Sequence, residues 1–369
     1  SRMTDYSQMS TEELLKLRSL NEREQVICEN KQMAIKILMN SLYGALSNEY
    51  FRYYDIRVAE SITVTGQLTI RWAENTINRY MRKILKSADN EDYVIAIDTD
   101  SLYIRTSDLV NKAVGDSLTV EKGVKFLDKV SEEKFEPLFE QAYDELCNHM
   151  NGYEQKMVMK REVIADKGIW TGKKHYALNV HNSEGVQFSE PYLKIMGIEV
   201  VRSSTPMPCR KMLKDTIRVI MNTDEETTQD YIRECKDIFF SLPPEDISFP
   251  RGVSDIEKWH DASTVYKKGC PIHVRGALLL NYLINTYELK NKYESISSGD
   301  KIKFAYLKMP NPVHENVIGF NGRLPPELGI NDFIDYDKQF DKSYLHPLMS
   351  ILDAIGWSPE KQISLEAFI

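Results

Sequence analysis

The sequence predicts an α+β fold, in which long helices accompany antiparallel strands. Two segments, from Thr11 to about Leu46 and from about Ile56 to Leu85, place apolar residues at the spacing of one helical face. Around Asp98 two short apolar runs flank a tight acidic turn, which is the order of an antiparallel hairpin. From Gln155 to Val200 apolar and polar residues alternate, which is typical of strands.

The first helical segment has a defined beginning and end. Ser10 and Glu13 form a capping box directly before the apolar pattern. Gly44 lies near the expected end of this helix, where glycine is common. In the second helical segment we expect a buried face of four apolar residues at helical spacing: Val64, Leu68, Trp72 and Ile77.

The remaining elements follow in order along the chain. An acidic amphipathic helix is predicted from Val120 to Met150, and strands are predicted from the runs KMVMKREVIA, KKHYALNV and YLKIMGIEV. Two helices that separate near Asn222 are predicted between Thr205 and Leu242, and a last helix from about Asn331 to Ile355. Prolines at positions 243, 244 and 250 indicate a loop or a subdomain boundary, and KIKFAYLKM resembles a hairpin.

Length and composition narrow the class of protein. The 369 residues, 42% of them hydrophobic and 28% charged, suffice for two or three subdomains with a core. The net charge of -8 argues against a small basic DNA-binding domain, although a local basic surface is compatible with it. Five scattered cysteines without a C-x-x-C pair indicate reduced thiols, and a zinc site is not expected. No apolar run reaches the roughly 18 residues that a membrane-spanning helix needs.

The first chemical motif is the acidic turn Asp98-Thr99-Asp100 between two apolar strands. Two carboxylates held this close repel each other unless a cation compensates their charge. Mg²⁺ suits such a pair because it takes oxygen ligands and shares them with phosphates of a substrate. The alternative is an ordinary turn, for which Asp and Thr are suitable residues. Strands on both sides make the turn rigid and favour the metal site.

The second motif is AIKILMNSLYG in the first helical segment. Lys36, Asn40 and Tyr43 are spaced i, i+4 and i+7, so they share one helical face. Lysine supplies charge to a phosphate, and an aromatic ring packs against a base or sugar, so this face suits a nucleoside triphosphate. The alternative is a half-exposed helix with Tyr43 in the core and Lys36 in solvent.

The third motif is a basic run with aromatic residues, KREVIADKGIWTGKKHYALN. Lys173 and Lys174 belong to a cluster of basic residues, and Trp170 and Tyr176 interleave with it. Positive and aromatic side chains on a β surface fit the backbone and minor groove of a nucleic-acid duplex. The alternative is a hairpin edge that lysines keep soluble.

These three motifs occur in the order and spacing of family B DNA polymerases, and the sequence most resembles the replicative enzymes of T-even phages. KILMNSLYGAL resembles the fingers motif K-x-x-x-N-S-x-Y-G, and DTDS resembles the palm motif that supplies catalytic carboxylates. TGKKHYALNV resembles the K-K-x-Y element between palm and thumb. With FRYYDIR, LKIMGIE, SSTP and PIHVRG, the resemblance covers nearly the whole chain, from about Ser7 to Ile369.

The resemblance implies a palm with an antiparallel sheet, a partial fingers helix and a mostly helical thumb. The implied ranges are 1–54 for the fingers helix, 55–203 for the palm, 204–362 for the thumb and 363–369 for a tail that binds a sliding clamp. Within the tail SLEAFI, the implied clamp-binding residues are Leu365 and Phe368. The alternative for the tail is a frayed end that carries a few apolar residues.

The resemblance also implies DNA-directed DNA synthesis with two Mg²⁺ ions. Asp100 is expected to bind both ions, Asp98 to lie beside them, and Glu162 to be a further metal-site carboxylate. Asp98, Asp100 and Lys36 form the implied catalytic set. The expected reaction is attack of a primer 3′-hydroxyl on the α-phosphate of a dNTP, with release of pyrophosphate.

Further residues are implied to bind the nucleotide and the DNA. Lys36 and Asn40 are expected to contact the incoming dNTP, and Tyr43 to pack at the nascent base pair. The residues implied to hold the primer–template are Lys173, Lys174, Tyr176 and Gly44. The infected bacterial cytoplasm is the implied location.

The sequence departs from the family pattern at several points. His175 stands where the family usually has arginine, Lys160 where the phage enzymes have aspartate, and Ile97 where glycine is common. The second palm motif, D-x-x-S-L-Y-P-S, does not occur, so the other metal-binding aspartate is missing. Because half of a two-metal site cannot balance two ions and a triphosphate, we expect no synthesis by this polypeptide alone.

An N-terminal polymerase polypeptide is therefore expected as a partner in a heterodimer. The chain is either the second subunit of a split polymerase, which Met3 would begin, or an engineered C-terminal fragment. Two other functions stay open. One is a non-catalytic subunit that binds DNA and tethers it to the clamp. The other is a metal-dependent phosphotransferase or nuclease that uses Asp98 and Asp100.

Overall fold

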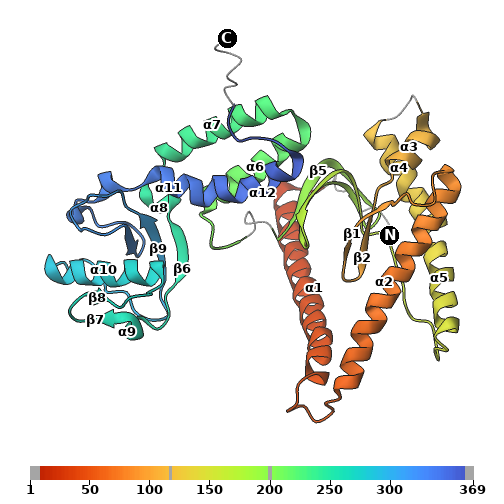
Figure 1. Ribbon diagram of the computed structural model, residues 1–369, viewed down its shortest axis with the longest axis horizontal. Helices are drawn as coiled ribbons and strands as arrows, with labels where there is room; N and C mark the ends of the chain where they lie inside the picture. The colour runs from red at the N-terminus through yellow and green to blue at the C-terminus, as the bar shows by residue number, and fades with distance from the viewer. Residues whose placement is uncertain (1–8, 116–118, 198–201, 362–369) are drawn as a thin grey trace. The chain divides into compact units, whose positions relative to one another are not determined.

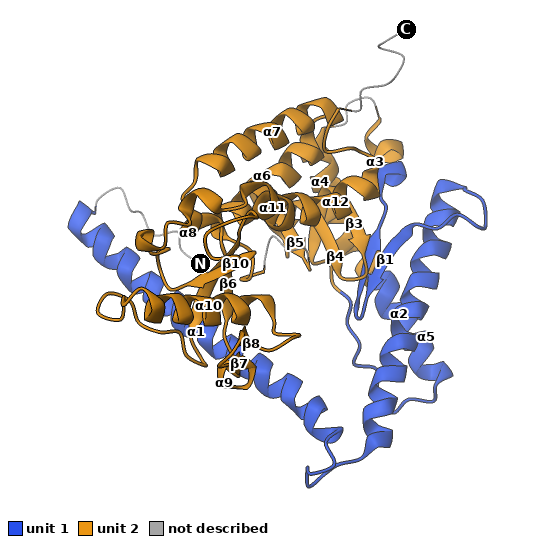
Figure 2. Ribbon diagram, turned by 60° about the vertical axis from the view of Figure 1, so that its left-hand side comes forward, with its two compact units in different colours: residues 1–109, 137–159 blue, residues 110–136, 160–369 orange. Residues whose placement is uncertain are grey.

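The computed structural model describes residues 9–115, 119–197 and 202–361, and Figure 1 shows its helices and strands. The chain divides into two compact units. Unit 1 comprises residues 1–109 and 137–159, and unit 2 comprises residues 110–136 and 160–369 (Figure 2). Helices and antiparallel strands occur together, so the predicted α+β fold is confirmed. The predicted ranges of fingers, palm and thumb stay a prediction, because compact units group residues by contact and not by role.

Unit 1 begins with helix α1, Thr11–Leu46. The predicted capping box is present: the Glu13 N–H donates to Ser10 Oγ at 3.3 Å, and the Ser10 N–H donates to Glu13 Oε2 at 2.9 Å. The helix ends two residues after Gly44 with Ser47 as its C-cap, as expected. None of the 36 residues of α1 is buried. Such a helix obtains little stability from packing within this chain.

Helix α2, Ile56–Leu85, follows after a turn. Asp55 caps it, and hydrogen bonds from the Arg57 guanidinium and backbone N–H lower the pKa of Asp55 to about 2. Of the predicted buried face, Ile77 is buried, but Val64 and Leu68 are exposed, so that prediction was wrong in its first half. Apart from Ala59, the buried residues of α2 lie between positions 69 and 81, where the apolar stripe is Ile70, Ala73, Ile77 and Met81.

The predicted acidic hairpin is confirmed. Strand β1, Val94–Asp98, pairs with β2, Ser101–Ile104, in an antiparallel ribbon. Helix α5, Glu136–His149, also contributes to unit 1, and its His149 ring stacks on Trp72 of α2 at 5.9 Å between ring centroids. The chain crosses between the units in α3, Ser107–Val114.

Unit 2 contains a three-stranded antiparallel sheet in the order β3-β4-β5. Its strands are β3, Val163–Gly172, β4, His175–Ser183, and β5, Val186–Met196. The predicted strand KMVMKREVIA, residues 156–165, is regular only from Val163, so it was wrong for residues 156–162. An alternating pattern forms a strand only where a neighbour takes its backbone hydrogen bonds, and pairing with β4 begins at Val163 opposite Ser183.

Helices of unit 2 pack around one apolar core. The predicted pair between Thr205 and Leu242 is confirmed as α6, Met207–Asn222, and α7, Glu225–Ser241. The expected helix from Val120 is α4, Val120–Val130, continued by the π-helical turn η2, Ser131–Phe135, and by α5. The last helix starts later than expected, as α11, Tyr336–Phe340, η6, Asp341–Leu345, and α12, His346–Ile355. Core side chains include Leu213, Ile217, Phe239, Phe340, Tyr344 and Leu348.

A second antiparallel sheet of unit 2 has the order β10-β9-β6. Its strands are β6, Phe249–Gly252, β9, Lys301–Tyr306, and β10, Val317–Phe320, and α10, Ile272–Thr286, packs on β10. The predicted hairpin KIKFAYLKM was wrong, because β9 is one central strand. Pro250 lies in β6 and not in a loop; an edge strand tolerates proline because one side of it needs no N–H donor. The short elements are α8, Pro244–Ile247, α9, Ile256–Trp259, β7, His260–Asp261, β8, Val265–Tyr266, η4, Pro326–Leu328, and η5, Asn331–Phe333.

All five cysteines are free, which agrees with the predicted reduced thiols. Burial raises the pKa of the Cys209 thiol to about 11, so this thiol is protonated at neutral pH. Among the described residues, no helix is both long and apolar enough to span a membrane.

Candidate functional site

The acidic turn lies at the tip of the β1–β2 hairpin. Asp98 and Ser101 are the last paired residues, and only Thr99 and Asp100 form the turn. The Asp100 N–H donates to the Asp98 carbonyl at 2.6 Å, and Ser101 Oγ donates to the same carbonyl at 3.1 Å. Thr99 has a φ of 54°, a left-handed conformation that is rare for a β-branched residue. The tip is therefore a tight, strained turn, and strain of this kind is concentrated at functional sites.

The two carboxylates of the turn differ in their surroundings. The Asp98 carboxylate is half-buried and accepts a hydrogen bond from Thr99 Oγ1 at 3.1 Å. Asp100 is exposed, and in the described part of the chain no hydrogen bond or ion pair to its carboxylate occurs. The Asp100 oxygens can therefore bind a cation without breaking a contact.

The donor chemistry of the tip fits Mg²⁺ only in part. Two carboxylates provide hard oxygen ligands, which Mg²⁺ prefers. Within residues 9–115, 119–197 and 202–361, however, no group of three or more histidine, cysteine or carboxylate side chains could hold a metal ion. Further ligands would have to come from substrate phosphates, water or a partner.

Glu162, the third predicted metal-site residue, lies in unit 2 directly before β3. Its carboxylate accepts from Lys194 Nζ of β5 at 2.5 Å. The Lys194 ammonium group neutralises the negative charge of the Glu162 carboxylate, as a bound metal ion would. A metal-binding role for Glu162 would require exchange of this partner, and the role stays a prediction.

The predicted nucleotide-binding residues lie on α1 in unit 1. Lys36, Asn40 and Tyr43 are all exposed, and the helix is continuous through them, so the three share one face. The proposed alternative of a buried Tyr43 does not apply, because this side chain is 42% exposed. Gly44 follows, and no atom lies within 4 Å of the place where a Cβ would stand. Glycine weakens a helix by about 1 kcal/mol relative to alanine. No contact at Gly44 within the described chain offsets this cost.

Many apolar residues of α1 are exposed together with this face. The most exposed include Leu15, Leu20, Val26, Met33, Ile35, Ile37, Leu38, Met39 and Leu42. Apolar surface of this extent marks an interaction site. The exposed apolar residues of α1 are therefore a candidate interaction surface.

The predicted basic residues Lys173 and Lys174 form the turn between β3 and β4. Gly172 pairs with His175 across this turn, and both lysines are exposed. Tyr176, in contrast, is 5% exposed, and its ring lies 6.2 Å from that of Trp170. In this structure the buried Tyr176 ring packs beside Trp170 within the β3–β4 hairpin, while Lys173 and Lys174 place their charge at the end of that hairpin.

Gly197 packs closely against the turn formed by Lys173 and Lys174, which we call the lysine turn. Its φ is 71°, and a Cβ at this position would lie 2.2 Å from the carbonyl oxygen of Lys174 and 2.2 Å from the His175 ring. We expect Gly197→Ala to lower the free energy of unfolding by about 2–4 kcal/mol, because it combines backbone strain with a clash against backbone. Denaturant unfolding monitored by circular dichroism measures this loss.

Gly185 supplies the matched control. It lies in the turn between β4 and β5 with a φ of 87°, and a Cβ there would meet no atom within 4 Å. Gly185→Ala therefore adds only the strain, of about 1–2 kcal/mol. Equal losses in the two variants would contradict the contact between Gly197 and the lysine turn.

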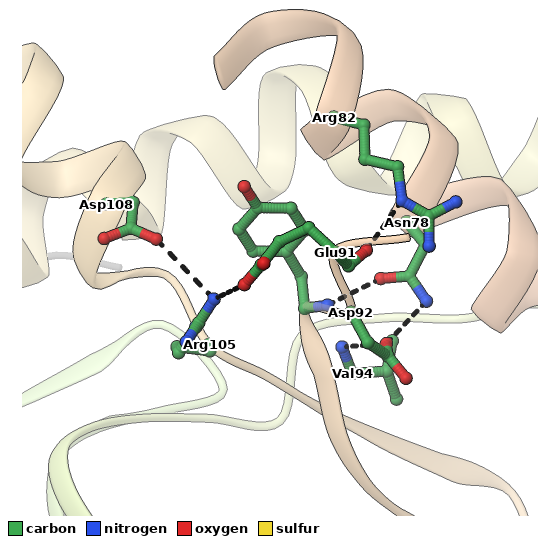
Figure 3. Close-up of polar contacts among 8 residues, drawn as sticks. Asn78, Arg82, Glu91, Asp92, Val94, Arg105 and Asp108 are labelled. Carbon is green, nitrogen blue, oxygen red and sulfur yellow. Dashed lines mark hydrogen bonds and ion pairs between the residues drawn. The ribbon is translucent and has the colours of Figure 1, made fainter. Parts of the chain in front are cut away.

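Sequence reasoning missed the residues that attach the acidic hairpin to α2. Asn78 and Arg82 of α2 bond to the segment directly before β1, and Arg105 follows β2 (Figure 3). One signal was available: Asn78 is a polar residue beside Ile77 on the apolar stripe of the helix. The predicted clamp-binding residues, Leu365 and Phe368, lie outside the described residues.

Comparison with known proteins gives consistent matches. The profile of DNA polymerase family B matches residues 9–355. The chain is 36% identical over 385 residues to the DNA-directed DNA polymerase of Escherichia phage RB69, covering 98% of this chain and 42% of that protein. Identity to the DNA-directed DNA polymerase of Enterobacteria phage T4 is 35% over 358 residues, covering 94% of this chain and 39% of that protein.

A more distant match covers part of the chain. The DNA polymerase beta of African swine fever virus is 28% identical over 180 residues, which is 47% of this chain and 14% of that protein. The chain thus spans about two fifths of the length of the two phage relatives it matches.

Proposed function

The chain belongs to DNA polymerase family B, and on this premise we propose that it is the C-terminal part of a template-directed DNA polymerase. The observation that carries the proposal is the exposed Asp100 carboxylate at the tip of the hairpin, which has no partner in the described chain. In the reaction, the primer 3′-hydroxyl oxygen forms a bond to the α-phosphorus of a dNTP. The bond to the β-phosphate breaks, pyrophosphate leaves, and the hydroxyl proton passes to solvent or a nearby base.

The acidic hairpin is proposed to hold the metal ions of this reaction. Asp100 provides the open carboxylate, and Asp98 adds charge beside it. When bound, Mg²⁺ supplies charge neutralisation to the triphosphate and lowers the pKa of the attacking hydroxyl. Glu162 contributes only if Lys194 releases its carboxylate. The rigid turn keeps the two aspartates at a constant separation before substrate arrives.

Helix α1 is proposed to bind the incoming dNTP as part of the fingers. Lys36 places an ammonium group against the triphosphate, where it offsets negative charge. Asn40, one turn further, offers an amide to the same phosphates, and Tyr43 offers a flat ring to the nascent base pair. Gly44, without a side chain, permits close approach of the DNA at the end of this face.

The end of the β3–β4 hairpin is proposed to bind the primer–template duplex. Lys173 and Lys174 are exposed on a two-residue turn, so both ammonium groups can reach phosphates of the backbone. Tyr176 lies beneath them and fixes the turn through Trp170. In this proposal residues 1–54 form fingers, 55–203 palm and 204–362 thumb, and the tail with Leu365 and Phe368 binds a sliding clamp. The setting is a phage-infected bacterial cell.

A second polypeptide segment is proposed to complete the enzyme. Two observations support it: the exposed apolar surface of α1, and an acidic turn that no third potential ligand joins among the described residues. An N-terminal polymerase polypeptide would cover the first and add the missing aspartate to the second. We call the assembly of this chain with that polypeptide the two-chain complex.

Primer extension tests the proposal. The chain alone, the N-terminal polypeptide alone, and both together are each incubated with primer–template, dNTPs and Mg²⁺. We expect extension only with both, at a rate at least about 10³-fold above either alone, because each part lacks a metal ligand. We also expect the two chains to elute together in gel filtration.

Other outcomes decide against parts of the proposal. Extension by this chain alone would contradict the need for a partner. A complex that binds DNA without incorporating nucleotides would favour a non-catalytic DNA-binding subunit. Failure of the two chains to associate, together with absence of extension, would contradict the proposal as a whole.

A further inference from the structure

The base of the acidic hairpin is attached to α2 by a buried side-chain amide. Asn78 is 5% exposed and lies beside Ile77 on the apolar stripe of α2. Burial of an amide among apolar side chains is costly unless its donor and acceptor both have partners. Asn78 finds these partners in the two residues that precede β1.

The bonds of Asn78 hold the first residues of the hairpin. Asn78 Nδ2 donates to Asp92 Oδ1 at 2.7 Å, and Asn78 Oδ1 accepts from the Tyr93 N–H at 2.8 Å (Figure 3). Asp92 Oδ1 also accepts from the Val94 N–H at 3.0 Å. One pair of side chains, Asn78 and Asp92, therefore binds two consecutive backbone N–H groups at the start of β1.

Neighbouring contacts close the base of the hairpin around this pair. One turn along α2, Arg82 Nε donates to the Glu91 carbonyl at 2.6 Å. The Arg105 N–H donates to the Tyr93 carbonyl at 2.7 Å, which joins the two ends of the hairpin. The Arg105 guanidinium pairs with the Glu91 carboxylate, lies 3.7 Å from the Asp108 carboxylate, and lies 5.4 Å from the Tyr93 ring centroid.

The orientation of the hairpin base, which is the segment from Glu91 to Val94, decides where the Asp98 and Asp100 carboxylates lie. Asp98 is four residues beyond Val94, which at about 3.3 Å per residue is roughly 13 Å from the base. A tilt of about 5° at the base therefore moves the tip by about 1 Å. Misplacement of about 1 Å can lower a rate about 10²-fold. A two-stranded hairpin is only marginally stable by itself, so its attachment to α2 sets this angle.

We infer that Asn78 is a positioning residue, which through its hydrogen bonds to Asp92 and Tyr93 holds Asp98 and Asp100 at the angle required for nucleotide incorporation. This role depends on the proposed function of the hairpin as the metal and substrate site. Asn78 itself contacts neither metal nor substrate. Its amide and the Asp92 carboxylate form a donor–acceptor pair that can be exchanged, and this property makes the role testable.

Four variants of the chain separate positioning from general stability. Asn78→Ala removes both hydrogen bonds, and Asn78→Asp replaces the donor by a carboxylate that faces Asp92. The double variant Asn78→Asp with Asp92→Asn exchanges the two groups, so an amide at position 92 donates to a carboxylate at position 78. The control is Thr76→Val, because Thr76 is also buried on α2 and its Oγ1 donates to Trp72 O within the helix at 2.9 Å.

Rapid-quench kinetics of the two-chain complex give the first readout. We expect the maximal incorporation rate to fall about 10²-fold in Asn78→Ala and Asn78→Asp. The dNTP concentration for half-maximal rate and the affinity for primer–template should stay near those of the wild type, since neither site includes Asn78. The exchanged pair should recover most of the rate, and Thr76→Val should match the wild type. An Asn78→Ala rate equal to that of Thr76→Val, or an exchanged pair as slow as Asn78→Asp, would overturn the role of Asn78.

Hydrogen exchange of the isolated chain gives a readout that needs no activity. The amide of Tyr93 should exchange about 10-fold or more faster in Asn78→Ala and return to the wild-type rate in the exchanged pair, because this N–H loses its acceptor, Asn78 Oδ1, and regains one in the carboxylate at position 78. If the wild-type complex fails to extend primers, the proposed function fails, and the exchange rates still decide whether the pair holds the hairpin. Unchanged exchange in Asn78→Ala would overturn that attachment.

Discussion

Replacement of Asp100 by asparagine is expected to lower nucleotide incorporation by the two-chain complex by about 10³-fold or more. Asparagine has the same shape and leaves the turn intact, since the bond at the tip is made by the Asp100 backbone N–H and not by the side chain. The change removes the negative charge from the open carboxylate, which is the strongest candidate metal ligand of the tip. Primer extension under saturating dNTP measures the loss.

Two further measurements distinguish a lost metal ligand from lost folding. Primer–template affinity should be unchanged or slightly tighter in Asp100→Asn, because one negative charge is removed near the DNA. Asp144→Asn, which removes an exposed carboxylate from α5 of the same unit, should retain wild-type extension. Near-normal synthesis by Asp100→Asn would contradict the proposed metal role of the hairpin.

Replacement of Lys36 by alanine is expected to reduce the incorporation rate about 10²-fold, with weaker dNTP binding as well. The physical reason is loss of a positive charge that, in the proposed function, acts on the triphosphate as negative charge accumulates in the transition state. The helix should be unaffected, because alanine is the strongest helix former and Lys36 is exposed. Single-turnover kinetics over a range of dNTP concentrations separate the effects on rate and on binding.

Lys31 provides a control on the same helix. It is exposed and lies five positions before Lys36, which corresponds to about 140° around the helix axis. Lys31→Ala therefore removes the same charge from a different face and should retain the wild-type rate. Equal losses in Lys31→Ala and Lys36→Ala would mean that α1 acts through its total charge and not through one face.

Local patterns predicted the elements of this fold well. The capping box at Ser10, the hairpin at Asp98 and the helix break at Asn222 each depend on residues close together in sequence. The exposure of Val64 and Leu68 could not be predicted, because helical periodicity shows which residues share a face but not how far along the helix a partner extends.

The candidate site was predictable in its residue types but not in its supporting contacts. Asn78 and Asp92 are 14 residues apart, and Glu162 and Lys194 are 32 residues apart. Such contacts depend on the register of strands and on the rotation of a helix, which local sequence does not determine. The burial of Tyr176 depends likewise on which side of β4 faces Trp170. The roles of these residues in synthesis stay predictions until the variants are measured.

The lack of buried residues in α1 also affects how fast a cell would degrade this protein. A helix of 36 residues with no buried position opens readily and offers proteases and chaperones an accessible substrate. If the proposed two-chain complex forms, molecules of this chain outside the complex would be removed faster than assembled ones. Matched dosage of the two chains would follow from turnover, without any dedicated regulator.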